Sequence, residues 1–319
     1  MKTQHSVSLP PDAPLPPDAP LAQTHPDALD ITASTRSWRW LVSGAIATSL
    51  FIVGTFAASS QNLPVPGQNR WLEVQQVRGS VTYRSGGQRR PARVGDRLQQ
   101  PSQEVSTASR SGTALSLDTT IGVIQVAENS NLRVRQMSTL QNGGRVTLLT
   151  VDRGQVRLQV RRFNNPSSRL EIQTPSGVAA VRGTDFGISV EPDGKTGIAT
   201  VTGAVEASAE GVDVMVNAGF GSSIVPGEAP TPPRPIDRVL FLELNRLRRT
   251  SSRLLVRGQV DPLNTILLDG QILTTNENGE FSTALAVRSN DYVSNRTLTL
   301  TVRNPIGDER NHFIDVPAF

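Results

Sequence analysis

The chain has 319 residues, a formal net charge of +4 and no cysteine. The absence of cysteine excludes disulfides, thiolate metal sites and cysteine nucleophiles, and only His5, His25 and His312 are available for histidine chemistry. The basic residues form no polybasic arm and the aromatic residues are few and scattered, so we expect no nucleic-acid partner.

Residues 1–37 form a proline-rich leader in which the run PPDAP occurs twice, at Pro10–Pro14 and Pro16–Pro20. This composition predicts a disordered or polyproline II segment on the cytoplasmic side of the membrane. A proline-rich segment can also be a ligand for an aromatic groove. The flanking aspartates and the absence of a basic anchor favour a solvated spacer instead.

Residues 38–60 are predicted to form a transmembrane helix, because an uncharged apolar run of this length spans roughly 30 Å. Basic residues at its N-terminal end place the N-terminus in the cytoplasm and residues 61–319 outside it. A cleaved signal peptide is the alternative, since small residues stand at suitable spacing around residues 55–59. The long leader favours an uncleaved anchor. The residues assigned to this anchor are Arg36, Arg39, Trp40, Leu50 and Phe56.

After a short linker at residues 61–70, residues 71–225 consist of brief runs that alternate apolar and polar residues between glycine-containing turns. No long amphipathic helix is visible, so the sequence predicts an all-β domain of layered strands. The expected strands are 71–77, 80–84, 113–117, 122–127, 131–136, 145–151, 155–160, 169–174, 179–182, 186–190, 197–201, 204–207 and 213–216.

Residues 226–236 contain five prolines and are expected to be a stiff linker that cannot pair into a sheet. Residues 237–319 then offer seven short strands, which suits a small β-sandwich. These strands are expected at 239–244, 253–260, 265–268, 271–274, 279–286, 297–303 and 312–316. Asp269, Asn276 and Asn278 could bind calcium, but they lack the spacing of a calcium loop, and turn formation is favoured.

Catalytic motifs are absent from the sequence, which contains no GxxxxGK[ST], GxGxxG, HExxH or GxSxG pattern. Asp185 is the best isolated acid, but a single carboxylate without a second acid, a histidine or a nucleophile has nothing to act with. A structural pair with an arginine, Arg182 being the nearest, is the favoured interpretation. We therefore expect a protein that is not an enzyme and needs no cofactor or metal.

Four segments, 94–98, 105–115, 170–186 and 200–205, resemble the FecR domain of bacterial envelope proteins, and the resemblance covers about residues 72–225. The stretch TPSGVAAVRGTDF at 174–186 is the specific part. Residues 256–260, 268–270 and 278–281 resemble, more loosely, a bacterial Ig-like domain. The FecR-like motif residues, expected to be structural, are Thr174, Pro175, Gly177, Arg182, Gly183, Thr184, Asp185 and Phe186.

The resemblance implies a single-pass protein of the bacterial inner membrane whose bulk is periplasmic. The best-known members sense an outer-membrane transporter and control an extracytoplasmic-function sigma factor through a cytoplasmic helical region. The leader departs from that pattern, because 37 residues with seven prolines do not build a helical domain. The first hypothesis is therefore a non-enzymatic, membrane-anchored binding or sensory module, and the alternative is a sigma-factor regulator.

Binding of an envelope protein or an anionic glycan is expected at arginine-bearing faces or at open sheet edges, because guanidinium groups pair bidentately with carboxylate and phosphate. A solvated face is the plainer explanation of the same arginines. The candidate residues are Arg84, Arg89, Arg90 and Arg93 around one turn, and Arg157, Arg161 and Arg162 after a valine-rich strand.

Overall fold

The computed structural model describes residues 70–250, 252–286 and 296–316, and the regular elements found there are all β-strands. All described residues belong to one compact unit of the chain. The all-β prediction is thus confirmed for the described residues. None of them belongs to a helix long and apolar enough to cross a membrane. The predicted leader and anchor lie outside the described residues.

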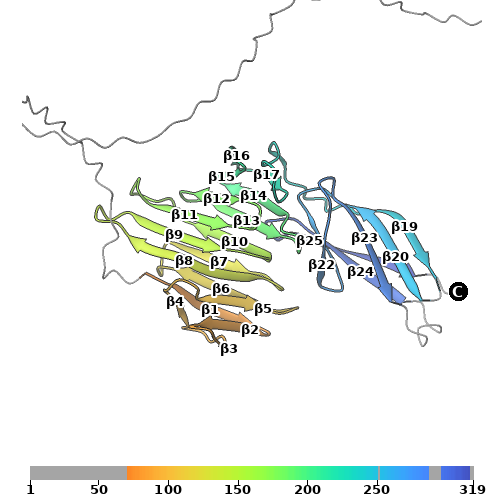
Figure 1. Ribbon diagram of the computed structural model, residues 1–319, viewed down its shortest axis with the longest axis horizontal. Coiled ribbons are helices and arrows are strands. Elements are labelled where there is room, and N and C mark those ends of the chain that lie inside the picture. The colour runs from red at the N-terminus through yellow and green to blue at the C-terminus, as the bar shows by residue number, and fades with distance from the viewer. Residues whose placement is uncertain (1–69, 251, 287–295, 317–319) are drawn as a thin grey trace, which may run out of the picture. The chain divides into compact units, whose positions relative to one another are not determined.

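Strands β1 to β18 form two nine-stranded sheets, which we call the large sandwich (Figure 1). Neighbouring strands are antiparallel except β9 and β11, which are parallel. The first sheet has the order β18 (Arg234–Pro235), β17 (Phe220–Ile224), β14 (Thr196–Thr202), β13 (Asp185–Val190), β10 (Gly154–Val160), β7 (Gly122–Val126), β6 (Gly112–Leu117), β1 (Leu72–Arg78) and β4 (Arg97–Leu98). The second has the order β16 (Val212–Asn217), β15 (Ala204–Ala209), β12 (Val178–Val181), β11 (Arg169–Gln173), β9 (Arg145–Thr150), β8 (Asn131–Thr139), β5 (Glu104–Thr107), β2 (Val81–Ser85) and β3 (Gln88–Pro91).

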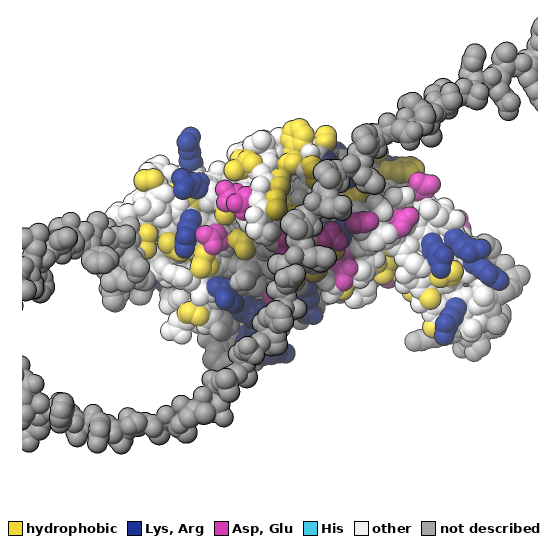
Figure 2. Space-filling model, turned by 45° about the horizontal axis from the view of Figure 1, so that its top comes forward, with side chains coloured by type: hydrophobic (Ala, Val, Ile, Leu, Met, Phe, Trp, Pro, Cys, Tyr) yellow, Lys and Arg dark blue, Asp and Glu magenta, His cyan; other side chains and the backbone are white. Residues whose placement is uncertain are grey.

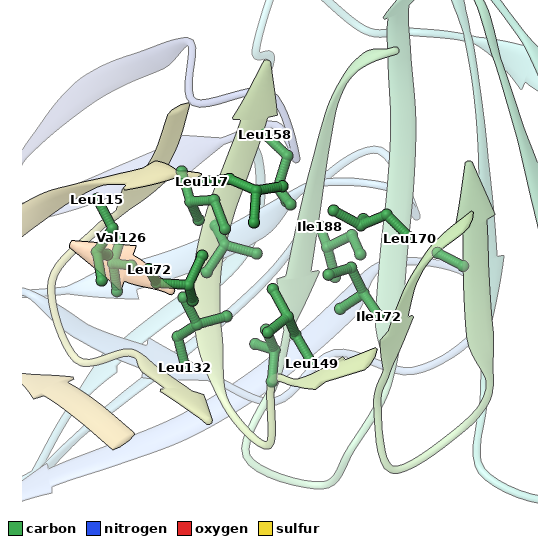
Figure 3. Packing of buried hydrophobic residues seen from close by; sticks show 14 of the residues in the cluster. Leu72, Leu115, Leu117, Val126, Leu132, Leu149, Leu158, Leu170, Ile172 and Ile188 are labelled. Atoms are coloured by element: carbon green, nitrogen blue, oxygen red, sulfur yellow. The ribbon is translucent and has the colours of Figure 1, made fainter. Parts of the chain in front are cut away.

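The core of the large sandwich is built by the alternation that the sequence shows. Leu115 of β6 and Leu158 of β10 belong to one cluster with Leu149 of β9 and Ile172 of β11, and all four side chains are fully buried (Figure 3). Successive side chains of a strand point to opposite faces, so alternate residues such as Val156, Leu158 and Val160 of β10 enter this cluster. Each such side chain contributes about 1.5–3 kcal/mol through burial.

The FecR-like motif joins the two sheets. The turn between β11 and β12 is closed by hydrogen bonds between Thr174 and Gly177, and Ser176 Oγ lies 2.7 Å from Thr196 Oγ1 on β14 of the other sheet. Gly183 has φ +123°, and a Cβ there would lie 2.2 Å from the Cα of Arg162, so only glycine fits. Phe186 is fully buried, as the pattern predicts.

Five strands of the large sandwich were not predicted, namely β3, β4, β5, β17 and β18. The expectation that residues 226–236 cannot pair is wrong, because β18 pairs with β17 through Phe220↔Pro235 and Gly221↔Arg234. The physical reason is position: β18 is the last strand of its sheet, and proline is tolerated at an edge, where its missing N–H costs no ladder bond.

Strands β19 to β25 form a three-stranded and a four-stranded sheet around a second core, and we call them the small sandwich. The first sheet has the order β19 (Glu243–Arg249), β20 (Arg253–Gln259) and β23 (Glu280–Ala286), and the second has the order β22 (Gln271–Leu273), β21 (Thr265–Leu268), β24 (Arg296–Arg303) and β25 (Glu309–Val316). Of the seven expected strands, the first was placed too early, at 239–244. The Ig-like assignment stays a prediction.

The turns of the small sandwich follow the expected chemistry. Asp269 and Gly270 both have positive φ, as a tight hairpin between β21 and β22 requires. Asn276 Oδ1 accepts the N–H groups of Asn278 and Glu280 at 3.0 and 2.9 Å, so this oxygen organises the turn before β23.

Candidate partner-binding site

The first predicted arginine group lies around β2 and β3, and half of it is engaged within the protein. Arg84 pairs with Glu104 at 2.6 Å. Arg90 makes two hydrogen bonds of 2.7 Å to Asp96, and its guanidinium stands 4.4 Å from the Tyr83 ring centroid. Hydrogen bonding from Arg90 holds the pKa of Asp96 below its usual value. Arg84 thus joins β2 to β5, and Arg90 stabilises the loop from β3 to β4, so both are poorly placed to bind a partner.

The other two members of this group, Arg89 and Arg93, are exposed, and no hydrogen bond or ion pair joins either guanidinium to the described part of the chain. Figure 2 shows the basic side chains of one face in several separate groups rather than one continuous patch. The exposed arginines therefore offer isolated charges, in keeping with the plainer expectation of a solvated face.

The second predicted arginine group is divided by the structure. Arg157 makes two 3.0 Å hydrogen bonds to Asp185, which confirms the expected Arg–Asp pair, with Arg157 rather than Arg182 as the partner. The hydrogen bonds that Arg157 donates to Asp185 raise the pKa of Arg157. Arg161 and Arg162 are exposed beyond the end of β10. Arg157 is thus a structural residue, and the three arginines do not form one surface.

The four edges of the large sandwich differ in what they offer a partner. β3 is exposed but carries Arg89, Arg90 and Pro91, features that protect an edge from pairing with another chain. β4 and β18 have two residues each. β16 has six residues and exposes 43% of Val212 and 50% of Met215. β16 is therefore the open edge of the large sandwich.

The surroundings of β16 are apolar as well. β17 follows after a tight turn and exposes 40% of Phe220. Hydrophobic side chains gather on the upper side of the face seen in Figure 2. The sequence predicted a strand at 213–216, but it did not identify that strand as an edge, because strand order depends on pairings between distant segments.

A buried polar network, which the sequence did not predict, joins the two sandwiches. Thr275 donates its N–H and Oγ1–H to the two carboxylate oxygens of Glu191 at 2.7 and 2.8 Å. Lys195 donates to Thr275 Oγ1 at 2.7 Å and to the carbonyl oxygen of Asn276 at 2.8 Å. All three side chains are buried. Burial raises the pKa of Glu191 to about 7 and lowers the pKa of Lys195.

A second set of contacts fixes the turn between β24 and β25 to the first sheet. Gln155 of β10 donates to the carbonyl oxygens of Asn304 and Pro305, both at 2.8 Å. A Cβ on Gly187 of β13 would lie only 1.9 Å from the Pro305 oxygen, so the two backbones touch there. The two sandwiches therefore form one continuous body. Within residues 70–250, 252–286 and 296–316, no group of three or more His, Asp or Glu side chains is arranged to hold a metal ion.

Comparison with known proteins identifies part of this body. The family model described as "FecR protein" matches residues 104–206, inside the range that the motifs indicated. Two crystal structures, at 2.50 and 1.65 Å, of a candidate anti-sigma factor from Parabacteroides distasonis ATCC 8503 are similar to this chain at 14% identity and TM-score 0.36. In both comparisons the matched region covers 46% of this chain and 68% of the anti-sigma factor chain. No curated protein sequence matches the chain.

Proposed function

Because residues 104–206 form a FecR domain, we propose that this chain is a non-enzymatic binding and sensory module of the bacterial envelope, anchored in the membrane by residues 38–60. Its partner is a protein that presents an extended segment. The observation that carries the proposal is the open edge strand β16, which lies directly after the FecR domain.

The chemistry of β16 suits the addition of a strand. One side of β16 is paired with β15, from Ala204↔Asn217 to Ala209↔Val212, and no described strand pairs with the other side. The backbone groups on that side can bond to an incoming strand, while Val212 and Met215 supply apolar contact. Main-chain hydrogen bonds of this kind give affinity, and the alternating side chains give specificity.

The second candidate is a regulator that passes partner binding to an extracytoplasmic-function sigma factor. The FecR domain supports this candidate, because the best-known proteins that the sequence resembles act in this way. Both candidates share the same sensing step outside the cytoplasm. They differ in whether residues 1–37 bind a sigma factor, which capture with an immobilised peptide of that segment measures directly.

We test the sensing step with the full-length chain carrying a photo-crosslinking residue at Asn217, at the end of β16. Cross-linked proteins are identified, and the affinity of each purified partner is then measured. In Val212→Lys/Met215→Lys, two lysines oppose strand addition at this edge, so we expect the cross-link to disappear and affinity to fall roughly tenfold or more.

Phe313→Lys is the matched control, since Phe313 is 72% exposed and lies on β25, an edge of the small sandwich. This variant makes one apolar-to-cationic change of the same kind and should keep the cross-link and the affinity. A partner that binds Val212→Lys/Met215→Lys as tightly as the unmodified chain would exclude β16 as the docking edge.

A further inference from the structure

A polar groove of about 770 Å³ lies where the small sandwich meets the first sheet of the large one. Its floor comes from β1, β6, β7 and β10, and its wall from the β24–β25 turn, including Arg303, Gly307 and Glu309. The wall is held in place by the hydrogen bonds from Gln155 to Asn304 and Pro305. The groove is therefore a fixed feature of the joined sandwiches.

The floor of the groove carries small residues on β6 and longer polar residues on the strands at both sides. Strand pairing places Arg78 opposite Gly112, and Gln76 opposite Ala114. On the other side, Gln125 of β7 is opposite Ala114. The two small residues of β6 lie between longer polar side chains, and the Arg78 guanidinium lies over Gly112, with Nη2 3.6 Å from where a Cβ would stand. Since neighbouring strands lie about 4.8 Å apart, Gln76 and Gln125 are separated by roughly 10 Å, close to three residues of an extended peptide.

The charges of the groove do not cancel. Arg303 pairs with two carboxylates, Glu128 at 3.1 Å and Glu309 at 2.8 Å, so this group of three carries one net negative charge. Arg157 is neutralised by Asp185. Arg78 and Arg110 also line the groove and are exposed, and no hydrogen bond or ion pair connects either guanidinium to the residues that the structure describes.

Arg110 is also held in an unusual backbone conformation. Its φ is +54°, and its N–H donates to Glu128 Oε2 at 2.6 Å. Positive φ is uncommon for a residue with a side chain and is strained, so it persists only where the surroundings impose it. Glu128 is itself fixed by Arg303, and the conformation of Arg110 is thus set by the walls of the groove.

We propose that this groove binds an extended acidic peptide segment, with carboxylates on Arg78 and Arg110 and peptide groups on the glutamines of the floor. Guanidinium groups bind carboxylates bidentately, and a glutamine amide carries both the donors and the acceptor that a peptide group requires. No residue that lines the groove is aromatic, so it offers no flat apolar face to a sugar ring. This site is separate from β16 and goes beyond the function proposed above.

The test uses the full-length chain and a fluorescent peptide of alternating Glu and Ser, with a Gln–Ser peptide of the same length as the uncharged probe. Fluorescence anisotropy should show binding of the acidic peptide and no binding of the Gln–Ser peptide. Added salt should weaken this binding, because salt screens interactions between exposed charges. The double variant Arg78→Ser/Arg110→Ser should weaken this binding by roughly tenfold or more. Its fold is checked by its thermal unfolding midpoint, which should not change because both side chains are exposed.

Arg89→Ser/Arg93→Ser is the matched control, because it removes the same charge from unpaired, exposed arginines at β3. It should bind the acidic peptide as the unmodified chain does. If both double variants lost the same affinity for the acidic peptide, the effect would depend on net charge and not on the groove, and the proposal would be overturned. Absence of binding, or binding of sodium polygalacturonate in place of the peptide, would overturn it too. Val212→Lys/Met215→Lys should bind the acidic peptide normally, which separates this result from the test of β16.

Discussion

A network of three residues, Glu191, Lys195 and Thr275, holds the two sandwiches together through hydrogen bonds and without a direct ion pair. The Thr275 hydroxyl accepts a hydrogen bond from Lys195 and donates one to Glu191, so it bridges the two charged groups. Burial removes the charged Glu191 carboxylate from water, which disfavours its ionised form. This effect is larger than the stabilisation of the ionised form by the Thr275 hydrogen bonds and the Lys195 charge. The pKa of Glu191 accordingly rises to about 7, and nearby Asp193 adds to the increase.

We predict that the protein loses stability as the pH rises from 4.5 to 7, the range between the ordinary and the raised pKa of Glu191. In this range the folded protein retains a proton that the unfolded chain has released, so the free energy of unfolding falls with increasing pH. The difference of the two pKa values corresponds to roughly 3 kcal/mol. Denaturant unfolding of the unmodified chain and of Glu191→Gln measures it.

In Glu191→Gln the amide can still bond to Thr275 but no longer titrates, so this part of the pH dependence should disappear. Glu206→Gln, which changes an exposed carboxylate on β15, is the control and should keep the pH dependence of the unmodified chain. Parallel curves for the unmodified chain and Glu191→Gln would show that Glu191 is already ionised at low pH in the folded protein.

At the level of elements, the contact between β13 and the β24–β25 turn depends on one missing side chain. Gly187 is fully enclosed, and a Cβ there would meet the Pro305 oxygen at 1.9 Å and the Ile306 Cα at 2.8 Å. Both neighbours are backbone atoms, which cannot rotate away. The turn itself is fixed by Asn304, whose Oδ1 accepts the N–H of Asp308 at 2.9 Å. The small sandwich can dock only where the first sheet presents bare backbone.

We predict that Gly187→Ala separates the sandwiches while both remain folded. The added methyl group overpacks the contact, which typically costs about 1–3 kcal/mol, and the turn must move away. Hydrogen exchange of residues 304–308 should accelerate, and thermal unfolding should show two transitions in place of one. Gly211→Ala is the control, since nothing lies within 4 Å of its Cβ and φ is +75°. It should destabilise its own turn and leave exchange at 304–308 unchanged.

At the level of the whole molecule, the proposed function requires the two sandwiches to lie outside the cytoplasm. We predict that protease added to spheroplasts degrades residues 61–319 and spares a small leader and anchor fragment, because Arg36 and Arg39 keep the N-terminal side in the cytoplasm. An epitope at the C-terminus reports the result. Its protection from protease would place the bulk of the chain inside.

Leu50→Arg tests the anchor itself. A charge at the centre of a spanning helix costs roughly 3 kcal/mol on insertion scales, so carbonate-resistant retention in the membrane should fall. Thr48→Ser is a neutral change in the same run and should leave retention unchanged. Equal retention of all three proteins would contradict a helix that spans the membrane at residues 38–60.

The sequence by itself determined the class of fold, most strand positions and the FecR resemblance. Alternation of apolar and polar residues is a local property of the pleated strand, so runs such as 113–117 and 155–160 could be located without knowing their neighbours. β3 and β18 were missed for the same reason: they lie at sheet edges, where neither face needs an apolar row.

Only the tertiary structure decided which strands are neighbours and which charges meet. Asp185 pairs with Arg157, because the register of β10 on β13 places Gln159 opposite Asp185 and Arg157 one diagonal step away. The bridge at Thr275 and the open edge at β16 likewise depend on segments far apart in the chain. The apolar–polar periodicity is a property of a single strand and can be read from its own sequence. Strand register, the identity of the edge strands and the docking of the two sandwiches depend on pairings between distant strands, which no local sequence pattern predicts.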